Sequence, residues 1–152
     1  DYDKGTTVNV GQLTGGTGIN VRPDFAEMKV DVRVTNHKAG KEIDKAIHHI
    51  ETHNHNIKVN IDGGEVRPVM EKTQETEMLF QQAKTYATEI GFDLEQVAVG
   101  GGSDGSFIAA QGTPTLDGLG GVGGGPHARN EHINTSKVVN RTTLLATLIE
   151  KL

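Results

Sequence analysis

The residue whose surroundings most favour chemistry is His127. It follows a stretch, residues 119–126, in which five of the eight positions are glycine. Ordering glycine costs more backbone entropy than ordering any other residue, so such loops are typical of places where the backbone passes close to a ligand or metal ion. Imidazole is a common metal ligand, and Glu131 and His132 follow closely enough to support the ring from a second layer. A metal-ligating histidine is therefore one hypothesis, and an ordinary loop histidine is the other.

A second glycine-rich segment, GGGSDGSF at residues 100–107, could bind an anionic group. It leads from an expected strand into an expected helix, so successive backbone N–H groups and the Ser103 hydroxyl, next to Gly102, can point at a negative charge. An ordinary strand-to-helix turn explains the same sequence equally well, and both interpretations stay open.

Arg33 and Asn20 are the third candidate site. Arg33 lies on the polar face of a well-patterned strand, and Asn20 ends the glycine-rich turn before it. A guanidinium and an amide that face a cleft are a natural receptor for a substrate carboxylate. A solvated sheet face is the alternative, and the residues alone favour that alternative.

Two other patterns indicate less. The GLGGVG sequence at residues 118–123 fits the dinucleotide-binding fingerprint, but Gly-Gly-Pro-His follows it where the fingerprint requires a helix. His49 and His53, in a histidine-rich tract, are four residues apart and could share a helix face that binds a metal. A solvated helix end is the interpretation we favour for that tract.

The first lobe that must position Arg33 and Asn20 reads β-β-α-β, an antiparallel sheet with one helix on one face. The alternation of apolar and polar residues predicts strands at 6–12, 27–34 and 56–62, and apolar spacing predicts a helix at 40–52. The strand at 27–34 is expected to be half-buried, and the helix to present one apolar stripe. These faces consist of Met28, Val30, Val32 and Val34 in the strand and of Ile43, Ala46, Ile47 and Ile50 in the helix.

The pattern changes at residues 65–68, so we predict two domains, residues 1–67 and residues 68–152. In the second domain, short strands alternate with helices, which is typical of part of an α/β sheet. The expected elements are a helix at 73–90, a strand at 95–99, a helix at 103–111, a strand at 114–116 and a helix at 135–152. The predicted buried stripes are Leu79, Ala83, Tyr86 and Ile90 in the first of these helices and Val138, Thr142, Leu145, Ile149 and Leu152 in the last.

Composition excludes several functional classes. The 152 residues include no cysteine, so disulfides, thiolate metal sites and a cysteine nucleophile are excluded. The 15 Lys and Arg against 20 Asp and Glu give a net charge of −5, and with two Tyr, four Phe and no Trp the chain is not expected to bind nucleic acid. No apolar run approaches the roughly 20 residues that a membrane helix needs, so no membrane partner is expected.

Taken together, these segments resemble one family, the dinuclear zinc amidohydrolases: glutamate carboxypeptidase, aminoacylase, acetylornithine deacetylase and succinyl-diaminopimelate desuccinylase. The stretch TTVNVGQLTGGTGINVRPDFAEMKVDVRV resembles the signature of their lid domain, most of all in the glutamate carboxypeptidase branch. The stretches GGGSDGSFIAAQGTPTLDGLG and GGGPHARNEHI resemble the C-terminal part of their catalytic domain. The resemblance implies a partial ferredoxin-like lid followed by the C-terminal part of an α/β/α zinc-peptidase domain, so the expected fold class is α+β with α/β.

The resemblance also implies roles for individual residues. His127 corresponds to the family's last metal ligand, and Glu131 stands where the family has a glutamate. The substrate-binding residues it implies are Asn20 and Arg33, which hold the free carboxylate, and Gly102 and Ser103, which line the pocket. The implied reaction is hydrolysis of an amide bond to an amino acid, with a water shared by two Zn²⁺ ions, or by Co²⁺ or Mn²⁺.

The remaining metal ligands and the general base of the family lie upstream of the lid, and none of them is in this sequence, which also lacks the first strand and helix of the family's lid. We therefore expect a fragment that is inactive alone, supplies no catalytic residue itself and needs the missing N-terminal segment to hold zinc. The expected partners are a peptide or N-acyl amino acid and a second copy of the chain, bound through the lid. A non-catalytic dimerisation or binding module is the alternative. Location stays open between cytoplasm and bacterial periplasm, because the first residue is not a methionine.

Overall fold

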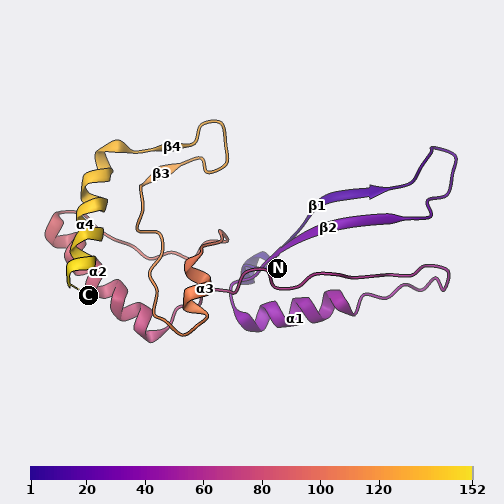
Figure 1. The fold of residues 1–152 in the computed structure, drawn as a ribbon, viewed down its shortest axis with the longest axis horizontal. Coiled ribbons are helices and arrows are strands. Elements are labelled where there is room, and N and C mark those ends of the chain that lie inside the picture. The colour runs from indigo at the N-terminus through magenta and orange to yellow at the C-terminus, as the bar shows by residue number, and fades with distance from the viewer. Residues whose placement is uncertain (152) are drawn as a thin grey trace. The chain divides into compact units, whose positions relative to one another are not determined.

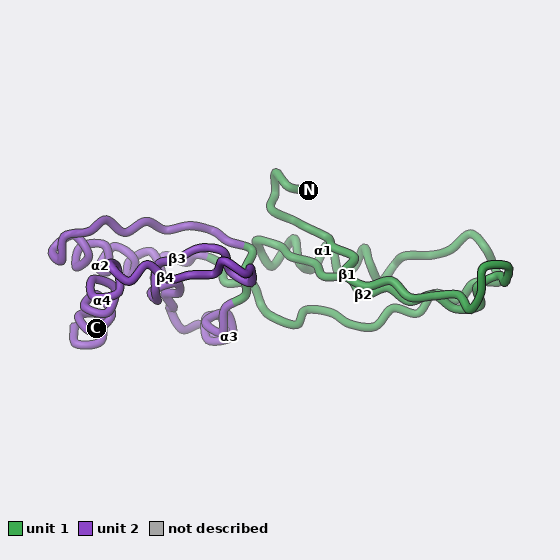
Figure 2. The backbone as a smooth tube through the Cα atoms, turned by 90° about the horizontal axis from the view of Figure 1, so that it is seen from above, with its two compact units in different colours: residues 1–71, 100–102 green, residues 72–99, 103–152 purple. Residues whose placement is uncertain are grey.

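The computed structural model describes residues 1–151, and it divides into two compact units (Figure 2). Unit 1 consists of residues 1–71 with residues 100–102, and unit 2 consists of residues 72–99 with the chain from residue 103 onward. The chain therefore leaves unit 1 after Glu71 and returns to it only for three glycines. The assignment of residues 1–67 to a lid domain and of residues 68–152 to part of a catalytic domain stays a prediction.

Unit 1 is built on one antiparallel hairpin (Figure 1). A short 3₁₀ turn, η1 (Tyr2–Lys4), precedes strand β1 (Thr7–Gly15), which pairs with strand β2 (Ala26–Arg33). The register runs from Thr7 opposite Arg33 to Gly15 opposite Ala26. The two strands predicted from alternation at 6–12 and 27–34 are thus present, joined by the glycine-containing turn.

An irregularity in β1 brings the apolar residues of the hairpin onto one face. The register shifts between Val10 and Gln12, so Gly11 is an extra residue on its strand. Without this bulge Leu13 would point to the face opposite Val10, because side chains alternate along a strand. With it, apolar residues of β1 stand opposite apolar residues of β2; these pairs are Val8 with Val32, Val10 with Val30, and Leu13 with Met28.

This apolar face is more exposed than the sequence pattern predicts. Met28 is 60% exposed and Val30 is 42% exposed, so the expectation of a half-buried strand is wrong for these two residues. Val32 and Val34 are half-buried. Burial of a sheet face requires another layer packed on it, and the described part of the chain does not cover this one.

Helix α1 (His37–His48) follows the hairpin and begins where Asn36 caps it, since the Asn36 side chain accepts a hydrogen bond from the backbone N–H of Ala39 at 2.8 Å. Its apolar stripe is shorter than expected. Ile43 and Ile47 are half-buried, whereas Ala46 and Ile50 are exposed, and Ile50 lies beyond the end of the helix.

The third strand expected at residues 56–62 is not formed. Figure 1 draws this segment as an extended trace, but it makes no ladder with either strand of the hairpin. A strand needs a neighbour to satisfy its backbone N–H and C=O groups, and the alternation of Ile57, Val59 and Ile61 supplies only the side-chain pattern. The β-β-α-β expectation is therefore corrected to β-β-α followed by an extended segment.

The core of unit 2 lies between helix α2 (Gln74–Ile90) and helix α4 (Val138–Lys151), as Figure 1 shows. The Thr73 hydroxyl caps the start of α2, and Gly91 ends it with a left-handed φ of 102°. The buried apolar residues of this core are Phe80, Ala83, Ala87, Leu94, Leu144 and Leu148.

The buried faces of these helices differ in part from the predicted stripes. In α2 the prediction holds in outline, since Ala83 is buried and Leu79, Tyr86 and Ile90 are half-buried. In α4 the predicted stripe is wrong, because Thr142, Leu145 and Ile149 are exposed while the neighbouring face buries Leu144 and Leu148. Val138 is also exposed, and Leu152, the last member of that stripe, lies outside the described residues.

Unit 2 contains little sheet. Helix α3 (Gly105–Ala109) falls inside the predicted helix at 103–111 and confirms it. The strands predicted at 95–99 and 114–116 are not formed in the described chain; instead, β3 (Gly123–Gly124) pairs antiparallel with β4 (His132–Ile133). The short 3₁₀ helix η2 (Thr135–Lys137) then leads into α4. The described fold is thus mixed α and β with two small antiparallel pairs, and the expected portion of a larger α/β sheet is absent from it.

Glu77, on the first turn of α2, is held in its ionised form. Lys72 forms an ion pair with it, and the side-chain amides of Gln81 and Gln96 donate to its two oxygens at 2.6 Å and 3.2 Å. These donors, Lys72 first, lower the pKa of Glu77 to about 2. A carboxylate near a helix N-terminus is also favoured by the helix dipole.

Candidate functional site

His127 stands at the tip of the hairpin formed by β3 and β4. The backbone N–H of Ala128 donates to the carbonyl of Gly125 at 2.9 Å, which closes a four-residue turn with Pro126 and His127 at its centre. His127 has a φ of 64° and is the one non-glycine residue with positive φ in the described chain. A proline at the second position of a turn and a positive φ at the third position are typical of a type II turn. Glycine is the usual residue at the third position of such turns.

A histidine in this conformation carries a backbone cost. The left-handed region costs a side-chain-bearing residue about 1–2 kcal/mol, although histidine is found there more often than most residues. The side chain is exposed. Strain of this kind at an exposed residue with a versatile side chain is a physical argument that the imidazole itself is needed.

The hairpin that carries His127 is fixed at both strands. β3 and β4 pair through Gly124 opposite His132, and just outside this pair the N–H of Asn134 donates to the carbonyl of Val122 at 2.7 Å. Position 123 requires glycine, because a Cβ there would overlap the carbonyl oxygen of His132. Gly123 thus allows a close approach of β3 to the backbone of β4, and the predicted approach of this loop to a ligand or metal ion stays a prediction.

Arg141, which is not among the residues predicted from the sequence, holds the same loop from α4. Its Nε donates to the carbonyl of Gly120 at 2.9 Å, and its Nη2 donates to the carbonyl of Gly118. Charge-assisted bonds from the planar guanidinium are among the stronger hydrogen bonds in proteins. A lone arginine in a helix gives no sign of a partner more than twenty residues upstream, so no local pattern identifies it.

Ser103 has a structural task in unit 2. Its hydroxyl accepts a hydrogen bond from the N–H of Gly105 at 3.0 Å, and its carbonyl accepts one from the N–H of Ser106 at 3.1 Å. Both bonds organise the start of α3. Gly102 belongs to unit 1, where a Cβ at this position would come within 3.0 Å of Nε of Arg67. Their substrate-binding roles stay predictions.

Arg33, at the end of β2, is oriented by two partners. Its Nε donates to Oδ2 of Asp31 at 2.9 Å, and its Nη1 donates to the carbonyl of Gly100 at 2.9 Å. Both partners lie in unit 1. Arginine has five N–H donors, so these two bonds fix the guanidinium plane and leave donors for an anion. The structure thus brings Arg33 to the glycine segment that contains Gly102.

Asn20 and Arg33 do not lie together within one copy of the chain. Arg33 is opposite Thr7 at the base of the hairpin, whereas Asn20 is in the turn beyond the pair of Gly15 and Ala26 at the other end. Seven residues of strand separate these ends, which at about 3.3 Å per residue is roughly 20 Å. Within one copy, Asn20 and Arg33 therefore do not face the same carboxylate.

The residues present do not fit a complete zinc site. In the part of the chain that the structure describes, no three histidine, aspartate or glutamate side chains lie close enough to hold a metal ion together. His127 offers one imidazole, which suits zinc, but a catalytic zinc has three protein ligands. The histidine-rich tract does not replace it, because α1 ends at His48 and His53 lies outside the helix.

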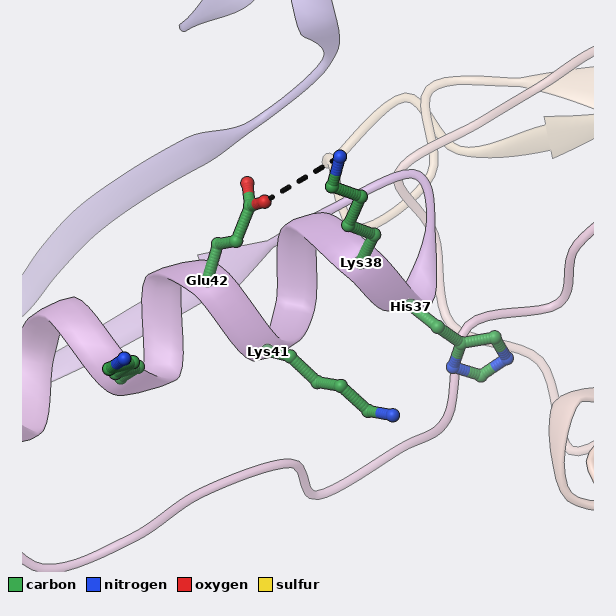
Figure 3. Close-up of a pocket in the computed structure, with 5 residues that line it drawn as sticks. His37, Lys38, Lys41 and Glu42 are labelled. Carbon is green, nitrogen blue, oxygen red and sulfur yellow. Dashed lines mark ion pairs between the residues drawn. The ribbon is translucent and has the colours of Figure 1, made fainter.

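A hollow of about 430 Å³ lies against α1, and none of the predicted site residues lines it (Figure 3). It is lined by His37, Lys38, Lys41, Glu42 and Lys45. Figure 3 shows Lys38 turned toward Glu42, at 3.9 Å, with His37 and Lys41 on other sides of the helix. An open hollow lined by exposed lysines is a solvated cationic surface.

No helix within residues 1–151 has both the length and the apolar character needed to cross a membrane.

Comparison with known proteins shows the family of the chain. Residues 3–151 match the family described as peptidase family M20/M25/M40. The chain is also similar to the uncharacterized protein YqjE of Bacillus subtilis (strain 168), with 27% identity over 156 residues. That match covers 98% of this chain and 40% of YqjE, so the chain spans less than half the length of this relative. Because the family match extends over nearly every residue, the chain belongs to peptidase family M20/M25/M40.

Proposed function

We propose that this chain supplies a metal ligand and a substrate-carboxylate receptor to a metal-dependent hydrolase that cleaves the amide bond to a C-terminal amino acid. Membership of the family supports a metallopeptidase or amidohydrolase relation. The family is zinc-dependent in general, and zinc at such a site polarises the scissile carbonyl and activates a water. The residues of this chain are proposed to bind the metal ion and to orient the substrate.

His127 is the proposed metal ligand. It presents an exposed imidazole from the tip of a hairpin whose two strands are both anchored, and its backbone is held at a φ of 64°. This left-handed histidine is the observation that carries the proposal, because glycine would fit the turn at lower cost and only the side chain explains why histidine stands there. The other ligands come from polypeptide outside these residues.

Arg33 is the proposed receptor for the substrate's free carboxylate. Asp31 and the Gly100 carbonyl fix its guanidinium plane, so the remaining N–H groups can form a bidentate pair with a carboxylate. The three-glycine segment next to it leaves room for the substrate backbone. Gly102 in this segment and Ser103 just beyond it are proposed to line the pocket.

Asn20 is proposed to act across a pair of chains. A single copy separates it from Arg33 by the length of the hairpin, so both can reach one carboxylate only if two lids associate. The exposed apolar face of the hairpin supports such association, because large apolar surfaces on a hairpin are typical of protein interfaces. We propose a homodimer through this face.

The experiment joins this chain to an upstream catalytic segment of the kind found in longer family members, loads the protein with Zn²⁺, and assays N-acyl amino acids. A matched substrate carries a C-terminal carboxamide instead of the carboxylate. We expect cleavage of the free acid only, and we expect Arg33→Met to raise KM by about 10- to 100-fold, which is the loss of one charged bidentate pair. The control is Arg22→Met, which replaces an exposed arginine in the turn between β1 and β2 and should change KM less than twofold.

Two results separate this proposal from the second candidate, a lid that only associates. Equal cleavage of the free-acid substrate and the carboxamide substrate would refute the proposed role of Arg33 as the carboxylate receptor. No cleavage of any substrate, together with a stable dimer in sedimentation equilibrium, would favour the association module instead. His127→Ala should abolish zinc retention if the first proposal holds.

A further inference from the structure

Arg141 of α4 reaches across to the glycine loop that leads to His127. Nε bonds the Gly120 carbonyl at 2.9 Å and Nη2 bonds the Gly118 carbonyl, so one guanidinium spans two acceptors on alternate residues. We propose that Arg141 is a positioning residue for His127: it fixes the loop from which the metal-ligating hairpin extends. This inference rests on the proposed function of His127.

The loop is held on two sides at this point. Leu119, between the two carbonyls that Arg141 binds, is half-buried and packs against the core of unit 2. Its side chain therefore anchors the loop inward, while the flanking carbonyls are bound by a side chain of α4. A glycine-rich segment has many accessible conformations. Because the three successive residues 118–120 are held in this way, few of these conformations remain accessible to the loop.

The constraint continues from the loop to the hairpin. Gly121 lies so close to Ile133 of β4 that a Cβ would overlap that side chain, and the next residue, Val122, accepts the hydrogen bond from Asn134 at 2.7 Å. Asn134 in turn caps η2, which runs directly into α4, since its side chain accepts from the N–H of Ser136 at 3.1 Å. The incoming strand is thus tied to α4 through Arg141, and the outgoing strand through Asn134.

Arginine suits this task better than lysine. Its guanidinium is planar, permanently charged and able to aim separate N–H groups at two acceptors, whereas an ammonium is a compact point charge. Lysine at position 141 should therefore hold one carbonyl at a time. We expect Arg141→Lys to restore part of what Arg141→Ala loses.

The first measurement is amide hydrogen exchange in the 152-residue chain. Arg141→Ala should speed exchange of the Asn134 amide, whose N–H donates to the Val122 carbonyl at the end of this loop, by about tenfold or more, and Arg141→Lys by less. Lys151→Ala removes a positive charge from the last turn of the same helix and should leave this amide unchanged. Protection at Ala83 and Ala87, in the core face of α2, shows that the unit is still folded.

The second measurement is Co²⁺ binding by the protein joined to its upstream catalytic segment, read from the visible absorption spectrum of the metal. Loss of a group that orients a ligand typically weakens metal affinity by 10- to 100-fold. We expect Arg141→Ala to weaken Co²⁺ binding by about tenfold and to shift the spectrum, and Arg141→Lys to recover part of both. A general loss of stability would not shift the spectrum of the fully loaded protein.

The outcomes distinguish this inference from the proposed function. If His127→Ala abolishes the Co²⁺ spectrum while Arg141→Ala changes neither affinity nor spectrum, the positioning role is refuted and the proposed function stands. If His127→Ala leaves the spectrum unchanged, the proposed function fails, and Arg141 then has no metal ligand to position. Exchange of the Asn134 amide within twofold of the unsubstituted chain in Arg141→Ala would also overturn the inference.

Discussion

The left-handed backbone of His127 leads to a prediction in which the usual order of two substitutions reverses. At φ 64°, alanine keeps the cost of about 1–2 kcal/mol that any Cβ incurs there, whereas glycine avoids it. Glycine also gives the unfolded chain more freedom, which offsets about 0.4–1 kcal/mol of that gain. We therefore expect His127→Gly to be more stable than His127→Ala by about 1 kcal/mol.

His132 provides the matched control, because it lies in β4 of the same hairpin and has no positive φ. In a strand, glycine lowers stability relative to alanine by about 0.5–1 kcal/mol. The His132→Gly variant should therefore be less stable than the His132→Ala variant. Urea unfolding of all four variants, followed by circular dichroism, measures the difference between glycine and alanine at both positions. The free energies of unfolding are comparable if the variants share the same dependence on urea concentration. If alanine is at least as stable as glycine at position 127, the strain is absent, and the main physical argument for a functional imidazole fails with it.

Two further predictions concern unit 2. Leu144→Ala should lower the free energy of unfolding by about 2–5 kcal/mol, because Leu144 is fully buried, and Leu145→Ala by less than about 1 kcal/mol, because Leu145 is 42% exposed; equal losses in urea unfolding would contradict the observed face of α4. Because hydrogen bonds from Lys72 first, and then from Gln81, lower the pKa of Glu77 from 4.5 to about 2, its contribution to stability is complete above pH 4.5 and is lost as the pH falls toward 2. Glu77→Gln should therefore lose less stability than the unsubstituted chain between about pH 6 and pH 3; the same pH dependence in both would refute the linkage.

Sequence periodicity predicted the helices and the hairpin because these elements satisfy their own backbone. The residues of β1 and β2 pair with each other, and α1 and α2 are closed by internal hydrogen bonds with side-chain caps. The strand expected at 56–62 has a suitable side-chain pattern but needs a neighbouring strand, and side-chain alternation does not reveal whether one is present.

The buried face of α4 was not predictable from apolar spacing alone. Leu144 and Leu148 form one stripe at helical spacing, and Leu145 and Ile149 form another, one residue later. Both stripes satisfy the same periodicity, and only the position of α2 decides which of them is buried.

The candidate site was predictable in its residue types and much less in its geometry. The glycines before His127 led us to predict a loop that passes close to a ligand or metal ion; the structure explains Gly123 by its close approach to the His132 carbonyl of the neighbouring strand. The clamp by Arg141 was not predictable, because it joins residues far apart in the sequence. The family resemblance implied that Asn20 and Arg33 act as a pair, but the hairpin places these two residues, which are thirteen positions apart in the sequence, at its opposite ends.

The extra residue in β1 also affects how the hairpin meets other chains. A two-stranded sheet has two free edges, and a flat edge beside an open apolar face is a template on which identical strands stack into aggregates. The bulge at Gly11 interrupts the regular hydrogen-bonding groups along that edge and increases its local twist. The same residue that makes the apolar face continuous therefore makes the free edge of β1 a poor template for strand addition, which agrees with the proposal that two chains associate through the face of the hairpin.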